Sequence, residues 1–141
     1  MRSKLLFIAF ISLILVSCTK DTDKTNPNSI EIPAALIAKW NWIYSNGGIA
    51  GITYTPQSTG EVRTIEFDAN NNYKYFVNDI LKTECKFDIE KLVSITNHDS
   101  VPTLIMNSWP SRQSIWFRSS DTLILFEEYF DGFEHHYTRI K

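Results

Sequence analysis

The sequence has no recognisable catalytic motif, few cysteines, no basic cluster and no long apolar run. It has no Gly-x-Ser-x-Gly, no phosphate-binding loop and no paired zinc spacing, so we expect a protein that is not an enzyme and needs no cofactor. Its 14 basic and 16 acidic residues are dispersed, which argues against nucleic acid as a partner. What remains is a chain rich in aromatic residues, with 19 among 141, four of them tryptophan.

The first 17 residues have the parts of a secretion signal. Arg2 and Lys4 supply a positive start, and residues 5–16 form an apolar run interrupted only by Ser12. As a helix this run would span roughly 18 Å, well short of the ~30 Å hydrocarbon core of a bilayer. We therefore interpret residues 1–17 as a signal peptide and not as a transmembrane helix.

The apolar run ends in Leu15-Val16-Ser17-Cys18, which is similar to a bacterial lipobox. That resemblance implies cleavage before Cys18 and attachment of acyl chains to it, a durable membrane anchor because each buried methylene contributes about 0.8 kcal/mol. The alternative is an ordinary signal peptide with a chance cysteine near its end. If Cys18 carries lipid, Cys85 is the only remaining thiol and no intramolecular disulfide can form.

Three segments are predicted from composition: the signal at 1–17, a lipidated cysteine with a flexible tether at 18–33, and a folded domain at 34–141. Residues 19–29 read TKDTDKTNPNS and contain no apolar residue, so they cannot bury enough surface to offset the entropy of ordering. Residues 32–38 suggest one or two helical turns, with Pro33 near the start.

Almost everything after residue 38 has the pattern of short strands and turns. Residues 81–89 alternate most cleanly, with Cys85 and Phe87 on one face and Lys86 and Asp88 on the other. Asp131-Gly132, flanked by aromatics, is the best hairpin signal. Eight or nine short strands without a long helix predict an all-β sandwich or an up-and-down barrel.

The order of several short motifs is similar to that of a known family. They are Ala38-Lys39-Trp40, Gly47-Gly48, Tyr54-Thr55-Pro56, Arg63 to Phe67, Asp131-Gly132-Phe133 and Tyr137 to Ile140. In this order they resemble the small lipocalin-like domain lipoproteins of Bacteroidetes-type bacteria, over about residues 36–141. The resemblance implies an all-β fold: a small eight-stranded up-and-down antiparallel barrel with one open mouth and a short N-terminal helical turn.

The resemblance also implies two sets of side chains inside the barrel. Trp40 would plug the closed end beneath Arg139, although Ala38 stands where the family has glycine. An arginine stacked on an indole contributes about 0.5–2 kcal/mol. An eight-stranded barrel either fills its interior with side chains or holds one small ligand. In the second case, the expected cup is lined by Trp42, Tyr44, Phe67, Tyr75, His135 and Tyr137.

Three constellations with metal or nucleophile character have simpler structural explanations. His135 and His136 are adjacent on a strand and should point to opposite faces, so they cannot chelate one ion. Asp68-x-Asn70-x-Asn72 mimics a calcium loop but has Tyr73 where glycine is needed, which favours a hairpin turn. Cys85 should lie inside among apolar residues and be inert. We therefore expect no metal site and no catalytic residue.

Two functions remain open at this point. The first is a membrane-anchored binding module that takes a small, mostly apolar ligand, with His135 available to orient it. The second is a structural or protein-interaction lipoprotein of the cell envelope with a filled barrel and an envelope protein as partner. Thr19 after the lipidated cysteine, by resemblance to sorting signals, favours the outer membrane.

Overall fold

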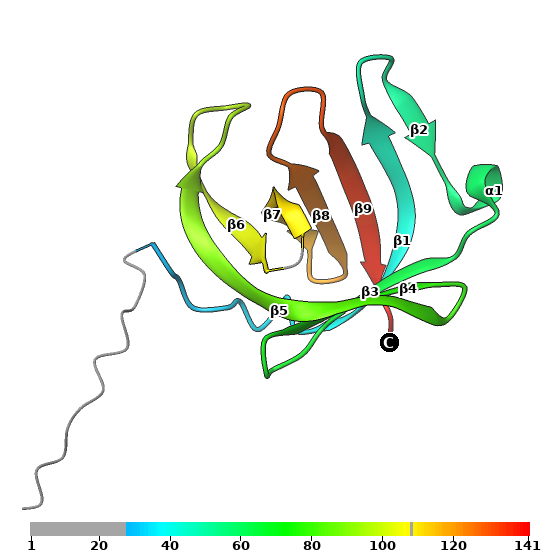
Figure 1. Ribbon diagram of the computed structural model, residues 1–141, viewed down its shortest axis with the longest axis horizontal. Helices are drawn as coiled ribbons and strands as arrows, with labels where there is room; N and C mark the ends of the chain where they lie inside the picture. The colour runs from blue at the N-terminus through cyan, green and yellow to red at the C-terminus, as the bar shows by residue number, and fades with distance from the viewer. Residues whose placement is uncertain (1–27, 108) are drawn as a thin grey trace, which may run out of the picture.

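The computed structural model describes residues 28–107 and 109–141, and shows an antiparallel barrel of eight strands with a ninth strand at its rim (Figure 1). The sheet order is β2-β1-β3-β4-β5-β6-β7-β8-β9, and an additional β1–β9 pairing closes the ring. The elements are β1 (Ala38–Gly47), β2 (Ile52–Tyr54), α1 (Pro56–Thr59), β3 (Arg63–Phe67), β4 (Asn72–Val77), β5 (Ile80–Val93), β6 (Ser100–Met106), β7 (Trp109–Ser119), β8 (Thr122–Glu127) and β9 (Phe133–Arg139).

The predicted fold class, an all-β up-and-down barrel of eight antiparallel strands, is confirmed. Strands adjacent in sequence pair with each other around the ring, and β1 meets β9. Polar turn residues make the connections: Asn78 and Asp79 join β4 to β5 with φ of 50° and 61°, and Asp131, in the predicted hairpin turn, has φ 59° between β8 and β9. Asn and Asp tolerate this left-handed conformation better than other non-glycine residues.

Two strands divide their length between different partners. The first part of β1 pairs with β3, while its end, from Ser45 to Gly47, pairs with β2 on that same side. The first half of β5 pairs with β4 and its second half with β6. In Figure 1, β5 accordingly curves around one side of the barrel.

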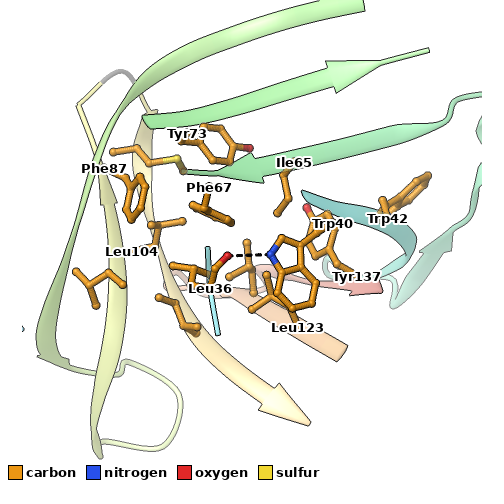
Figure 2. Close-up of a cluster of buried hydrophobic side chains, with 14 residues drawn as sticks. Leu36, Trp40, Trp42, Ile65, Phe67, Tyr73, Phe87, Leu104, Leu123 and Tyr137 are labelled. Carbon is orange, nitrogen blue, oxygen red and sulfur yellow. Dashed lines mark hydrogen bonds between the residues drawn. The ribbon is translucent and has the colours of Figure 1, made fainter. Parts of the chain in front are cut away.

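The apolar core gathers at the end of the barrel where the chain enters. Leu36 and Trp40 are both completely buried, and the Trp40 indole nitrogen donates a 3.0 Å hydrogen bond to the Leu36 carbonyl (Figure 2). Phe67 contacts Phe87 edge to face with ring centroids 5.1 Å apart. This end is the closed end of the barrel.

The opposite end holds a close crossing between β1 and the turn that leads into β9. A Cβ added at Gly47 would lie 2.5 Å from the Gly132 carbonyl oxygen, and one added at Gly132 would lie 2.6 Å from the Glu127 carbonyl oxygen. Gly47 also has φ of 156°. Only glycine allows two backbones to approach so closely.

Helical structure is short in this barrel. The one or two turns predicted in residues 32–38 are a single turn, closed by a 2.8 Å hydrogen bond from Leu36 N to Pro33 O. The one helix of the described residues, α1, was not expected, because the sequence after residue 38 predicts short strands and turns. Its Thr55 cap accepts from Ser58 N, and Pro56 at its start explains why a helical turn forms there.

The N-terminal segment is held against the barrel before residue 34. Ile30 N donates to Ile89 O at 2.9 Å and Lys91 N donates to Asn28 O at 2.8 Å, which adds a short pairing to β5. Residues 28–33, assigned from composition to the flexible tether, therefore contact the domain. Residues 1–27, which include the predicted signal peptide and Cys18, lie outside the described residues. No helix in the described part of the chain is long and apolar enough to cross a membrane.

Candidate functional site

A cavity of about 160 Å³ lies inside the barrel, beyond Trp40 as seen from the closed end. Four of the six side chains predicted to line a cup do line this cavity: Trp42, Tyr75, His135 and Tyr137. They come from strands at the β1–β9 seam and from β4. In Figure 2, Trp42 and Tyr137 lie on the side of Trp40 away from Phe67 and Phe87. The remaining lining residues are Arg63, Tyr73, Met106, Gln113 and Glu127.

Tyr44 and Phe67, also predicted in the cup, lie elsewhere. The β1–β9 register shifts between Trp42 and Tyr44, so a bulge at Ile43 reverses the faces of the residues that follow. Tyr44 consequently stacks on His136, with ring centroids 4.1 Å apart, and Ser45 points inward. Phe67 does face inward but is packed in the closed-end core, with only 1 % of its surface exposed.

The bulge places Ser45 in a chain of hydrogen bonds beside the cavity. The Trp42 indole N–H donates to Ser45 Oγ at 2.8 Å, and Ser45 Oγ lies 2.7 Å from His135 Nδ1. On the other side of the imidazole, His135 Nε2 lies 3.3 Å from Glu127 Oε1. We call these four residues, Trp42, Ser45, His135 and Glu127, the polar chain.

The chemistry of the side chains determines which groups of the polar chain donate and which accept. Indole N–H can only donate, so the Ser45 hydroxyl accepts from Trp42. The Glu127 carboxylate can only accept, so His135 Nε2 is the donor to it. In the tautomer with its proton on Nε2 alone, His135 Nδ1 accepts from the Ser45 hydroxyl. Burial by itself raises the pKa of Glu127, but hydrogen bonds from His135, the Tyr129 hydroxyl and the Phe133 amide together hold that pKa below its usual value.

Among the described residues, Arg63 is the one lysine or arginine that lines the cavity, and it stacks on Trp42. Its guanidinium carbon lies 4.4 Å from the centre of the indole ring. The Nε and Nη2 groups both contact Glu61 Oε2, at 2.8 and 2.7 Å. Among the described residues no acceptor is recorded for Nη1, so one edge of the guanidinium is not bound by the protein.

The three tyrosines and the glutamine of the cavity differ from the polar chain in having no side-chain partner. Among the described residues no hydrogen bond is recorded for the side chains of Tyr73, Tyr75, Tyr137 or Gln113. Tyr73, Gln113 and Tyr137 are each at least 91 % buried, with relative exposures of 9 %, 8 % and 8 %. Their polar atoms are not enclosed, because among the described residues the fully buried side-chain atom without a hydrogen-bond partner is His136 Nε2. The hydroxyls and the amide therefore open on the cavity, where water or a ligand can bind them.

A second cavity, of about 250 Å³, adjoins the first. Both are lined by Arg63 and His135, and the second is completed by Ser45, Tyr54, Thr59 and Phe133. Tyr54 and Thr59 belong to β2 and α1, the segment that leaves the ring at the rim. The two cavities therefore form one site, which runs from the barrel interior to the β2–α1 segment.

The stack predicted at the closed end is present. The Arg139 guanidinium carbon lies 4.5 Å from the centre of the Trp40 ring. Arg139 also donates to the carbonyls of Ser120 and Ala35. It thus ties the last strand to the segment that enters beneath the barrel, and the predicted packing of Trp40 with Arg139 is confirmed.

The other constellations show the expected geometry. His135 lines the cavity, whereas His136 points to the opposite face, 3.2 Å from Glu134. Asp68 accepts hydrogen bonds from Asn70 N, Asn72 N and the Asn72 amide, as in a hairpin turn. Cys85 is half-buried and packs against the core. Within the described part of the chain, no three His, Cys, Asp or Glu residues are grouped so as to hold a metal.

Strand alternation could have found most of the lining residues that the sequence analysis missed. Arg63 has the same parity as Ile65 and Phe67, and Glu127 has that of Leu123 and Leu125, which are both buried. Gln113 shares a face with Ile115 in the same way. No sequence signal marks Ser45, because its inward position depends on the bulge at Ile43.

Comparison of this chain with protein families, with curated proteins and with solved structures finds no match. The assignment of the site therefore depends on the geometry of the residues described above.

Proposed function

We propose that this protein is a lipid-anchored binding module that takes one small molecule into the open end of its barrel. The observation that carries the proposal is a cavity onto which the largely buried side chains of Tyr73, Tyr137 and Gln113 open their polar atoms, without a protein partner in the described part of the chain. A barrel filled with side chains would leave no such cavity, whereas here a bound molecule can pair with these groups.

The size of the site supports a small ligand. A cavity of about 150 Å³ holds benzene, and the inner cavity here measures about 160 Å³. The adjoining 250 Å³ could accept a substituent of such a ring. Trp42 and Met106 provide apolar surface for its body, while Arg63 and the tyrosines provide polar contacts.

The anchor belongs to the proposal and depends on the lipobox-like sequence that ends at Cys18. Palmitate labelling in the bacterium tests it directly. We expect the full chain to incorporate labelled palmitate and to sediment with the membranes, and Cys18→Ala to lose both properties. Labelling of the Cys18→Ala protein at the wild-type level would contradict the anchor.

Native mass spectrometry tests the binding function. The full chain would be extracted from its own cell envelope in detergent and released from the micelle in the instrument. We expect an additional mass that disappears on denaturation and is absent from Trp42→Ala protein. A wild-type protein with no additional mass in several preparations would contradict a resident ligand.

A protein partner is the second candidate, and exposed apolar side chains in two loops favour it. Ile49, between β1 and β2, is 92 % exposed, and Phe130, between β8 and β9, is 85 % exposed. Exposed apolar clusters commonly mark interaction surfaces. Crosslinking from these two positions in the cell would capture a specific protein if this candidate is correct, whereas the binding-module proposal predicts none.

We also infer that the polar chain positions groups and does not catalyse. Ser45, His135 and Glu127 superficially match a nucleophile, a base and an orienting acid. However, Ser45 is 98 % buried, with 2 % exposure, and its oxygen already accepts the Trp42 N–H. A fluorophosphonate probe should leave Ser45 unlabelled; labelling that is lost in His135→Ala would point to an enzyme instead.

A further inference from the structure

We propose that the ligand is a small aromatic carboxylate, with its ring in the inner cavity and its carboxylate at Arg63. This inference depends on the proposed binding function and adds the chemical class of the ligand. It follows from which hydrogen-bond donors and acceptors of the cavity have no partner within the described protein, and from the position of Arg63.

The acceptors of the site are already engaged by the protein. Ser45 Oγ accepts from Trp42, His135 Nδ1 is the neighbour of the Ser45 hydroxyl, and Glu127 receives His135, Tyr129 and the Phe133 amide. The polar chain therefore has little capacity left to accept hydrogen bonds from a ligand.

Several groups of the cavity have no hydrogen-bond partner in the described part of the chain. They are the hydroxyls of three tyrosines, the amide of Gln113 and one edge of the Arg63 guanidinium. Burial raises the pKa of Tyr73, Tyr75 and Tyr137, so all three phenols keep their protons at neutral pH and can donate as well as accept. Gln113 also offers both a donor and an acceptor, whereas the guanidinium can only donate, and a carboxylate with its two oxygens complements it.

Charge places the carboxylate at Arg63. The guanidinium is held flat on Trp42, 4.4 Å from the ring centre, and it lines both cavities. Glu127 is the negative side chain of the inner cavity and faces His135. Glu61, which pairs with Arg63, and Glu127 both oppose added negative charge, so the site should accept one carboxylate, at the guanidinium edge that Glu61 does not contact, and not a dicarboxylate.

The walls select a flat apolar body. Trp42, Met106 and the faces of Tyr73, Tyr75 and Tyr137 surround an inner cavity of about 160 Å³. That volume suits a single six-membered ring. Benzoate is the smallest compound that combines this ring with one carboxylate, and it serves as the probe.

Calorimetric titration of the full chain in a non-ionic detergent tests the proposal with benzoate and with benzamide, its neutral isostere. We expect benzoate to bind about tenfold to a hundredfold more tightly, as expected for charge-assisted hydrogen bonds. Arg63→Met should remove that preference, and Tyr137→Phe should weaken benzoate by about three- to tenfold. Arg118→Met is the matched control: it removes an exposed arginine from β7 and should leave both affinities unchanged.

The possible outcomes test the class of ligand separately from the proposed binding function. Benzamide binding as tightly as benzoate, or a benzoate preference that survives in Arg63→Met, would overturn the carboxylate while leaving a functional cup. Failure of both probes to bind would overturn the aromatic carboxylate as well. In that case the native mass experiment still decides on the cup, because it makes no assumption about ligand chemistry. Circular dichroism of each variant confirms that the barrel is folded.

Discussion

Two arginines stack on two tryptophans of the same strand, yet the two pairs differ in what else they contact. Trp40 and Trp42 lie on one face of β1, with guanidinium carbons 4.5 and 4.4 Å from their ring centres. At the closed end, Trp40 donates to the Leu36 carbonyl, and Arg139 donates to backbone carbonyls and makes a longer contact, 3.8 Å, with Asp121 Oδ1. At the open end, Trp42 donates to a side chain and Arg63 pairs with the side chain of Glu61.

The difference shows that an arginine stacked on a tryptophan can serve two purposes. The closed-end pair is tied to backbone atoms, whose positions the fold fixes, so it joins the entering segment to the last strand. The open-end pair is tied to side chains that can rearrange and borders a cavity. We expect the first pair to contribute mainly to stability and the second mainly to ligand binding.

The largest effect should come from Trp40→Ala. Truncation of a fully buried tryptophan at the closed end should lower the free energy of unfolding by about 3–5 kcal/mol. Trp42→Ala should cost less, because Trp42 already borders a cavity, and should instead abolish ligand binding. Guanidinium unfolding of both variants measures the difference; a greater loss of stability in Trp42→Ala would contradict the assigned roles.

Substitution of the two arginines should also cost more stability at the closed end than at the open end. Arg139→Met loses the stack and the hydrogen bonds to the Ser120 and Ala35 carbonyls, and should cost about 2 kcal/mol. Arg63→Met loses its stack and a partly exposed ion pair with Glu61, and should cost less than about 1 kcal/mol. Equal losses in urea unfolding would show that the backbone contacts of Arg139 add nothing.

Acid should weaken the open end before the closed end. The folded pKa of Glu127 lies below its unfolded value, so its contribution to stability is present above the unfolded pKa of about 4.3 and is lost as pH falls through the folded pKa. Glu127→Gln should therefore have a lower free energy of unfolding than wild type near neutral pH, and this difference should become smaller as pH falls below about 4. A difference in free energy that does not depend on pH would show that Glu127 does not contribute through its charge.

The smallest change in stability is expected for Tyr137→Phe. The hydroxyl has no recorded partner among the described residues, so its removal should change the free energy of unfolding by less than about 1 kcal/mol, and could raise it. Binding of the ligand should nevertheless weaken. A marked loss of stability without any change in binding would place the hydroxyl in a structural contact and not at a ligand site.

Strand alternation and turn residues predicted an all-β sandwich or barrel, whereas the eight-stranded barrel and the closed-end stack were implied by the resemblance to lipocalin-like lipoproteins. Four of the six residues predicted for the cup line the cavity. Regular strands reverse faces at every residue, so Trp42 and Tyr137 could be placed by parity. Tyr44 could not, because one additional residue at Ile43 reverses that parity. Phe67 was assigned to the correct face of its strand but to the wrong level along the barrel. That level depends on how strands shift along one another around the ring.

The pairing of β1 with β9 also determines when the protein can complete its folding. Ser45 and His135, which meet across this pairing, are 90 residues apart in the chain. Such distant contacts form late, because the ordering of the intervening loop must come first. The polar chain crosses the same seam, and the glycine crossing at Gly47 and Gly132 lies at its end. Until the last strand arrives the site is open and incomplete, so the appearance of ligand binding during refolding would report the final step of barrel closure.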